Sequence, residues 1–261
     1  EIGIGHSNDL ENLESRGKLD THDVKLSTRA KERGMRALGT LGSGNHFLEI
    51  QCVESVEDNE TAKHWGLYEG QLLAMIHSGS RGLGHQVCSE HSRKLEQMYR
   101  RDGNRWYNEN WDYHVADRQL ACAPFHSKEG QQYLDDMNGA ANFAFANRSA
   151  LAHRLREVLK LEMGVDGEAK TLYDVAHNIA KVETHTIHGK NCQCAVHRKG
   201  ATRAFGGDQL ELNSHFKITG QPVLVPGDMG TGSWIMSGPV SGQKQAFGSS
   251  CHGAGRSLSR T

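Results

Sequence analysis

The sequence predicts a mixed α/β (α+β) protein in which central sheets are flanked by helices. Short apolar segments of strand length alternate along the chain with longer segments that repeat apolar residues at helical spacing. One large domain is expected over residues 1–261, because no linker, low-complexity tract or internal repeat divides the sequence. Gly-rich turns follow several strand candidates, so the active site is expected in a cleft that these turns line.

The first third of the chain contains one helix candidate and two strand candidates. Residues 1–36 are polar and are expected to form a loop followed by a short helix within 27–35. Segment 45–53 alternates apolar and polar residues, which indicates a strand. The apolar run 72–77 has the length of a buried strand, and the Gly-rich sequence after it offers backbone N–H groups to an anion.

Two longer helices are expected next, over 85–101 and 131–161. An aromatic and polar loop through Trp106, Trp111 and Tyr113 is expected between them. The second helix carries leucine and valine residues at helical spacing near its end, which indicates core packing rather than chemistry.

The C-terminal half is expected to be rich in strands and turns. A strand over 171–176 leads into His177 and Asn178, which are expected to open a helix. The later candidates are a hairpin of 183–188 with 191–198 joined near Gly189, a basic loop over 198–203, and strands at 222–226 and 234–236.

Composition limits the classes of function. The chain has 261 residues, of which 36% are apolar, enough for a sizeable core. No apolar run approaches the roughly 18–20 residues that cross a bilayer, and no leader is recognisable, so a cytoplasmic location without a membrane partner is expected. A net charge of −1 means that any nucleic acid would be bound by a local patch.

The six cysteines are scattered, which favours free thiols over a disulfide framework. Cys192 and Cys194 form the one close pair. With His188 and His197 nearby, this pair is compatible with a zinc clip, but alternate cysteines on a hairpin are more often incidental.

Four histidines recur in the same setting, each next to an apolar or Gly-rich segment: His46, His77, His177 and His252. One such histidine is usually structural, whereas four in matching surroundings suggest a shared site. His46, His77 and His177 are the candidates for nitrogen ligands of Mn, Zn or Fe(II). The candidate oxygen donors or supporting partners are Glu49, Asp174 and Glu183.

Gly-rich turns at 42–44, 79–84, 227–232 and 253–255 are either ordinary tight turns or phosphate-binding turns made of backbone N–H groups. None has the P-loop pattern or a Rossmann fingerprint. Arginine and lysine residues beside them suggest a polyanionic substrate such as a nucleic-acid end, the alternative being solvated surface charge. These residues are Arg81, Arg198, Lys199, Arg203, Arg256 and Arg260.

At these positions the sequence resembles the RtcB family of tRNA-splicing RNA ligases. The resemblance rests on LGTLGSGNHFLEIQ, MIHSGSRGLGHQV, DRQLACA, YDVAHNIAKVE, VHRKGATRAF, PGDMGTGSW and CHGAGRSLSR, in one consistent order over roughly residues 28–261. It implies the family-specific fold and an enzyme that uses GTP and Mn(II), with two ions in the complete protein. Such an enzyme joins an RNA 2′,3′-cyclic phosphate or 3′-phosphate to a 5′-hydroxyl through a guanylylated histidine, in tRNA splicing or RNA repair.

The resemblance also implies a role for particular residues. His252 is the histidine expected to become linked to GMP, and His46, His77 and His177 are the expected manganese ligands. The residues expected to contact the guanylate are Asn45, His46, Phe47, Leu48, Glu49, His177, Asn178, Pro226, Gly227, Asp228, Met229, Ser233, His252, Gly253, Ala254 and Gly255. RNA phosphates are expected at Arg81, Arg256 and Arg260. The expected RNA is a pair of tRNA halves or a broken RNA, and no activating protein partner is identified.

The sequence departs from the family pattern in ways that suggest an incomplete chain. It has no counterpart of the family's D-x-G-C-G-M segment, which supplies an Asp and a bridging Cys to the metals, or of a C-terminal lysine that meets the guanylate. Gly206 and Gly207 stand where the family usually has prolines. The chain by itself is therefore expected to be inactive. The two other functions considered are a metal-dependent phosphohydrolase acting on RNA ends and a non-catalytic module that binds RNA ends.

Overall fold

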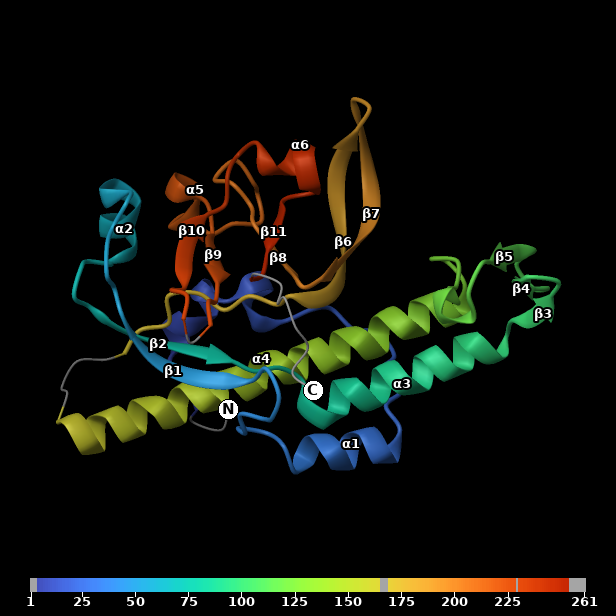
Figure 1. The fold of residues 1–261 in the computed structure, drawn as a ribbon, viewed down its shortest axis with the longest axis horizontal. Coiled ribbons are helices and arrows are strands. Elements are labelled where there is room, and N and C mark those ends of the chain that lie inside the picture. Colours follow the sequence, from blue (N-terminus) through green and yellow to red (C-terminus); the bar gives the residue numbers. More distant parts are fainter. Residues whose placement is uncertain (1–3, 165–168, 229, 254–261) are drawn as a thin grey trace. The chain divides into compact units, whose positions relative to one another are not determined.

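The computed structural model describes residues 4–164, 169–228 and 230–253. Helices and antiparallel sheets are combined in it (Figure 1), so the mixed α/β class is confirmed. The chain divides into two compact units. The first consists mainly of Gly17–Leu48 and Ile76–Asp166, and the second of His6–Arg16, Glu49–Met75 and Gly167–Thr261.

Three helices build the core of the first unit: α1 (Thr28–Met35), α3 (Arg81–Gln97) and α4 (Lys128–Met163). The side-chain oxygens of Ser27 and Ser127 accept from the first-turn N–H groups of α1 and α4, which fixes where these helices begin. The buried side chains that the helices share are Ala30, Leu83, Val87 and Ala140. Within the described part of the chain, no helix has the length and apolar character needed to cross a membrane.

The helix expected over 131–161 is confirmed as part of α4, whereas the limits expected for the preceding helix are wrong. Helix α3 begins at Arg81, directly after the Gly-rich turn, and ends at Gln97. The turn and the helix thus share residues, and glycines at 82 and 84 did not prevent helix formation because α3 packs against both α1 and α4.

The aromatic segment expected to be a loop is instead a three-stranded antiparallel sheet. It consists of β3 (Arg100–Asp102), β4 (Arg105–Asn108) and β5 (Tyr113–Val115), and the short 3-10 helix η3 (Arg118–Leu120) follows it. Cross-strand neighbours such as Trp106 and Val115 stabilise these short strands, a long-range pairing that composition did not predict.

Both N-terminal strands are confirmed, but the burial expected for 72–77 is not found, since Leu72 and Ala74 are exposed. β1 (Phe47–Cys52) pairs with β2 (Leu72–His77) in a two-stranded sheet. Helix α2 (Asn59–Trp65) lies between them in sequence, with the Asp58 carboxylate accepting from its first turn and Gly66 ending it in the left-handed conformation.

The hairpin of the second unit is longer than expected. β6 (Asn178–Ile187) pairs with β7 (Lys190–Lys199) over ten residues, so the helix expected to begin at Asn178 is wrong. Burial alternates in the second half of β6, where Lys181, Glu183 and His185 are buried and the residues between them are exposed. This period of two is that of a strand.

The remaining elements of the second unit are short. The strand expected over 171–176 is reduced to a single bridge between Asp174 and Leu13, while the strand expected at 222–226 is confirmed. The core contains Tyr173, Phe205, Leu212 and Phe216. The elements are η1 (Ser7–Asn12), η2 (Glu14–Gly17), β8 (Ala201–Arg203), α5 (Phe216–Thr219), β9 (Pro222–Val225), β10 (Trp234–Ser237), α6 (Gly242–Ala246) and β11 (Ser249–Cys251), with β8 paired to β11 and β9 to β10.

Two arginines of the expected basic loop are structural. Arg198 lies on β7 and Arg203 on β8, and both are buried. Arg198 donates two hydrogen bonds to the Glu183 carboxylate, at 2.6 and 2.9 Å. Arg203 lies 2.9 Å from Glu211 and 3.7 Å from Glu14. The expectation that these two arginines bind phosphate is therefore wrong, because both are buried and the buried carboxylates of Glu183 and Glu14 compensate their charge.

Candidate functional site

The first unit brings two of the expected metal ligands together. His46 directly precedes β1 and His77 ends β2. Their ring centroids lie 6.3 Å apart at an interplanar angle of 65°, and Phe47 packs edge-on against His77 at 5.1 Å. The apolar residues that make β1 and β2 strands thus place both imidazoles at one end of the same sheet.

Arg81 holds the His46 ring in place. Its Nη1 donates to His46 Nδ1 at 3.1 Å, and its Nε donates to Thr40 Oγ1 at 3.3 Å. Burial and then the charge of Arg81 lower the pKa of His46, so this imidazole is neutral over a wider pH range than usual. Gly42 has a φ of +115°, and a Cβ there would collide with both Arg81 and His46. The glycine of this turn is therefore required by the close approach of the two side chains.

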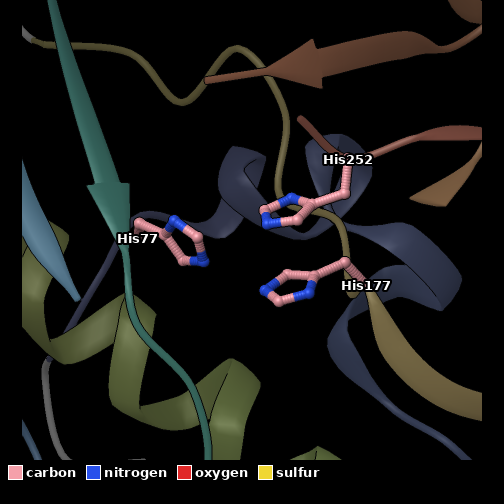
Figure 2. Close-up of side chains that lie close together, drawn as sticks. All are labelled: His77, His177 and His252. Atoms are coloured by element: carbon pink, nitrogen blue, oxygen red, sulfur yellow. The ribbon is translucent and has the colours of Figure 1, made fainter. Parts of the chain in front are cut away.

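The second unit stacks the other two histidines. The rings of His177 and His252 lie face to face with centroids 3.8 Å apart and planes inclined by only 3° (Figure 2). One ring nitrogen of each lies within 4.8 Å of the other. His77, the third residue labelled in Figure 2, belongs to the first unit.

Gly200 explains why the two rings meet. It links β7 to β8, and its N–H donates to the His177 carbonyl at 2.9 Å and to Asn178 Oδ1 at 3.1 Å. Its own carbonyl accepts from the His252 N–H at 3.3 Å. One residue thereby connects the start of β6 with the end of β11, and its φ of +65° favours glycine there.

The electrostatic environment favours the neutral form of His252. Burial, followed by the positive charge of Lys199, lowers the pKa of this imidazole from its usual value. A neutral ring has the free electron pair that a nucleophile or a metal ligand needs. Sequence reasoning placed Lys199 beside a phosphate site but did not connect it with His252.

The loop between β9 and β10 contains several residues expected to bind guanylate. Ser233 Oγ accepts from the Gly227 N–H at 3.0 Å, and the Asp228 side chain accepts from the Gly230 N–H at 2.8 Å. A Cβ added at Gly253 would lie 3.3 Å from the Pro226 carbonyl oxygen, so the start of this loop approaches the residue after His252. The second unit therefore places Pro226 next to Gly253.

Other expected site residues are distributed as follows. Asn45 and Leu48 are exposed in the first unit, and Glu49 is an exposed residue of the second. Asp174 forms the bridge to Leu13, and Glu183 is buried with Arg198, so Glu183 is not available to a metal. Five residues of the expected nucleotide and RNA sites lie outside the described residues: Met229, Ala254, Gly255, Arg256 and Arg260.

The cysteine pair shows no features of a zinc clip. Cys192 and Cys194 lie on β7, and each thiol is directed at a backbone carbonyl, at 3.6 and 3.7 Å. Among residues 4–164, 169–228 and 230–253, no cluster of metal-ligand side chains includes either thiol.

Fold and site together define a mixed α/β protein with histidine-based sites in both units. A family model described as "tRNA-splicing ligase RtcB" matches residues 1–261, and the chain belongs to this family. The resemblance found in the sequence motifs is thereby confirmed.

Curated relatives carry the same description. The chain is 48% identical to the tRNA-splicing ligase RtcB of Thermococcus kodakarensis over 262 residues, which cover 99% of this chain and 52% of that protein. It is 46% identical to the protein of that name from Archaeoglobus fulgidus over 264 residues, covering all of this chain and 53% of the relative. The Pyrococcus horikoshii protein is 49% identical over 263 residues, covering 99% and 29%. The chain thus spans about half the length, or less, of these relatives.

Proposed function

We propose that the protein carrying this chain is a GTP- and Mn(II)-dependent RNA ligase. It joins RNA 2′,3′-cyclic phosphate or 3′-phosphate ends to 5′-hydroxyl ends through a guanylylated histidine, in tRNA splicing or RNA repair. Family membership supports the reaction class, and the stacked pair of His177 and His252 is the observation that carries the mechanism. The expected substrates are tRNA halves or broken RNA, and the cytoplasmic location stays a prediction.

The donor chemistry fits the proposed metal. Manganese accepts imidazole nitrogen, and His46, His77 and His177 are the proposed ligands. Burial and Arg81 lower the pKa of His46 and so favour the neutral form that a metal ligand needs. A bound Mn(II) would withdraw charge from a phosphate and make its phosphorus easier to attack.

The stacking geometry supports different roles for His177 and His252. Ring nitrogens carry their electron pairs in the ring plane, so two parallel rings direct these pairs at neighbouring points instead of at one common ion. His177 would then hold the metal, and a ring nitrogen of His252 would attack the α-phosphorus of GTP. A phosphorus–nitrogen bond forms, the bond from the α-phosphorus to the bridging oxygen breaks, pyrophosphate leaves, and the other ring nitrogen of His252 loses its proton to solvent.

The proposed guanylate contacts come from both Gly-rich and polar segments. In the second unit, Gly227 and Asp228 lie on a loop that reaches Gly253, where backbone N–H groups can meet phosphate oxygens. Arg81, Arg256 and Arg260 are proposed to contact RNA phosphates, because guanidinium groups bind phosphate in a bidentate way. In the structure Arg81 is bonded to His46, so phosphate binding requires it to share or exchange that partner.

Labelled GTP tests the proposal directly. The full-length protein is incubated with GTP and Mn(II) and then denatured. A covalent GMP adduct that is stable to base and lost in acid supports the ligase. Release of phosphate without an adduct supports the phosphohydrolase, and neither result supports the module that only binds RNA ends.

A further inference from the structure

Asn147 is a fully buried residue in the middle of α4, the helix whose sequence indicated packing only. Its side-chain oxygen accepts from the Gly39 N–H at 2.6 Å and from the Thr40 N–H at 3.2 Å. These two residues begin the turn that leads through Gly42 to His46. One side of the amide is therefore committed to the loop that carries a proposed metal ligand.

The nitrogen side of the same amide reaches the loop after β2. Nδ2 lies 3.1 Å from the Thr40 carbonyl oxygen, 3.2 Å from Ser78 Oγ and 3.1 Å from the Gly79 carbonyl oxygen. Its two hydrogens are thus shared among three acceptors. Ser78 directly follows His77, the other proposed ligand of the first unit. A single side chain consequently joins both loops.

Neighbouring side chains reinforce this connection. Ser78 Oγ donates to the Leu41 carbonyl at 2.7 Å, so the two loops are also bonded to each other. From α4, Arg148 Nη1 donates to the Ser78 carbonyl at 3.3 Å and Arg154 Nη1 donates to the Gly39 carbonyl at 2.7 Å. These bonds join each arginine to one loop, whereas the amide of Asn147 bonds to both loops.

A buried asparagine that bonds to backbone is usually a structural residue, and Asn108 is such a case in the same unit. It is equally buried, and its Oδ1 accepts from the N–H groups of Asn110 and Trp111 at 3.0 and 3.2 Å. Those bonds form a local turn between β4 and β5. Asn147 differs because its bonds connect segments distant in sequence, one of which leads to His46 while the other directly follows His77.

We propose that Asn147 is a positioning residue for the metal site, fixing the backbone of the loops that carry His46 and His77. The proposal rests on the proposed function, because it takes these two histidines as manganese ligands. Metal affinity is higher when the ligands are held in place before the ion binds. Loss of a residue that orients the ligands commonly lowers the metal affinity about 10- to 100-fold. Asn147 does this through backbone bonds, without touching the ion.

The test compares Asn147→Ala with Asn108→Ala in the full-length protein. Mn(II) alone is titrated into each variant, and free Mn(II) is measured by electron paramagnetic resonance, a readout independent of activity. Denaturant unfolding measures the stability of both. Since each substitution removes buried hydrogen bonds, both variants are expected to lose stability, but only Asn147→Ala is expected to bind Mn(II) about 10-fold or more weakly.

Ser78→Ala is the second variant, in case Asn147→Ala does not fold. It removes the bond to Leu41 and one contact with Asn147 while keeping the loop lengths, and a smaller loss of Mn(II) affinity is expected. Equal Mn(II) affinity in wild type and in the folded Asn147 and Ser78 variants, while wild type forms the GMP adduct, would overturn this inference alone. Equal weakening by Asn108→Ala would also overturn it, since the effect would then follow stability. A wild-type protein that neither binds Mn(II) nor forms an adduct would overturn the proposed function as well.

Discussion

The imidazole rings of His177 and His252 are stacked in parallel, with their centroids 3.8 Å apart. They come from different sheets, because His177 precedes β6 and His252 follows β11, and Gly200 is hydrogen-bonded to the backbone of both. Two parallel rings direct the electron pairs of their nitrogens at adjacent points, because these pairs lie in the ring planes. The pair therefore suits a metal and a phosphorus atom side by side.

The proposed division of roles predicts different effects of removing each ring. His252→Ala is expected to abolish the GMP adduct and to leave Mn(II) binding largely intact, since the proposed metal ligands are His46, His77 and His177. His177→Ala is expected to lose both, because removing a metal ligand lowers the affinity directly. Labelled GTP measures the adduct, and metal analysis after gel filtration measures Mn(II).

A second histidine pair provides the control. His64 and His215 are stacked at 4.3 Å in the same unit and are not proposed to contact metal or nucleotide. His215→Ala should keep both the adduct and the metal. If His252→Ala removes Mn(II) as completely as His177→Ala does, the assignment of roles is wrong.

Gly200 provides a prediction about backbone conformation. Gly200→Ala places a Cβ where nothing lies within 4 Å, so its cost comes from the φ of +65° and is about 1 kcal/mol. A small shift of this residue moves both His177 and His252, so adduct formation is expected to fall about 10-fold or more. Gly189→Ala is the matched control, because Gly189 has a φ of +77° and equally open surroundings at the tip of the β6–β7 hairpin. Equal loss of adduct in both variants would show that Gly200 has no special role.

Much of the local structure could be predicted because the relevant signals are short-range. The alternation in β1, the apolar run of β2 and the helical spacing in α4 are each patterns within a single element. His46 and His77 could be found for the same reason, since each lies at the end of such a segment.

The features that could not be predicted depend on contacts between segments distant in sequence. Strand β6 forms because it pairs over ten residues with β7. This pairing outweighs the local pattern that predicted a helix after His177. The burial of Arg198 depends on Glu183 of the facing strand, which no local pattern reveals. The role of Asn147 likewise could not be predicted from the sequence of α4, because its hydrogen-bond partners lie in two loops far away in sequence.

The buried pair of Arg198 and Glu183 yields a stability prediction. Arg198→Met leaves the Glu183 carboxylate buried without its bidentate partner, at an expected cost of about 3–5 kcal/mol in the free energy of unfolding. Replacing both residues by Met removes the uncompensated charge, so most of that loss should be recovered. Urea unfolding of Arg198→Met, Glu183→Met and the double variant measures the coupling energy between the two side chains. A double variant no more stable than Arg198→Met would show that the charge pair is not the cause.

The buried carboxyl group of Glu14 is expected to make the stability of the second unit depend on pH. Its carboxylate is buried and accepts from Lys181 Nζ at 2.7 Å and from the Ala176 N–H at 2.8 Å. Burial alone would raise its pKa, but the charges of Lys181 and Arg203 and these hydrogen bonds outweigh burial and lower the pKa from 4.5 to about 2. Burial is the largest effect on Lys181 and lowers its pKa. The ionised form of Glu14 is stabilised by Lys181 and Arg203 together.

A carboxyl group whose pKa is lower in the folded protein stabilises it above the unfolded pKa and loses that effect as the pH falls through the folded value. The shift of Glu14 from 4.5 to about 2 therefore contributes on the order of 3 kcal/mol at pH 7, with less than half of it left by about pH 3. Glu14→Gln should lose about that much stability in urea at pH 7, and its difference from wild type should shrink as the pH falls towards 2. Glu211→Gln is the control, because Glu211 pairs with the same Arg203 but is 54% exposed, and its loss should stay below about 1 kcal/mol. A difference between Glu14→Gln and wild type that does not change with pH would show that the ionised carboxylate is not what stabilises this unit.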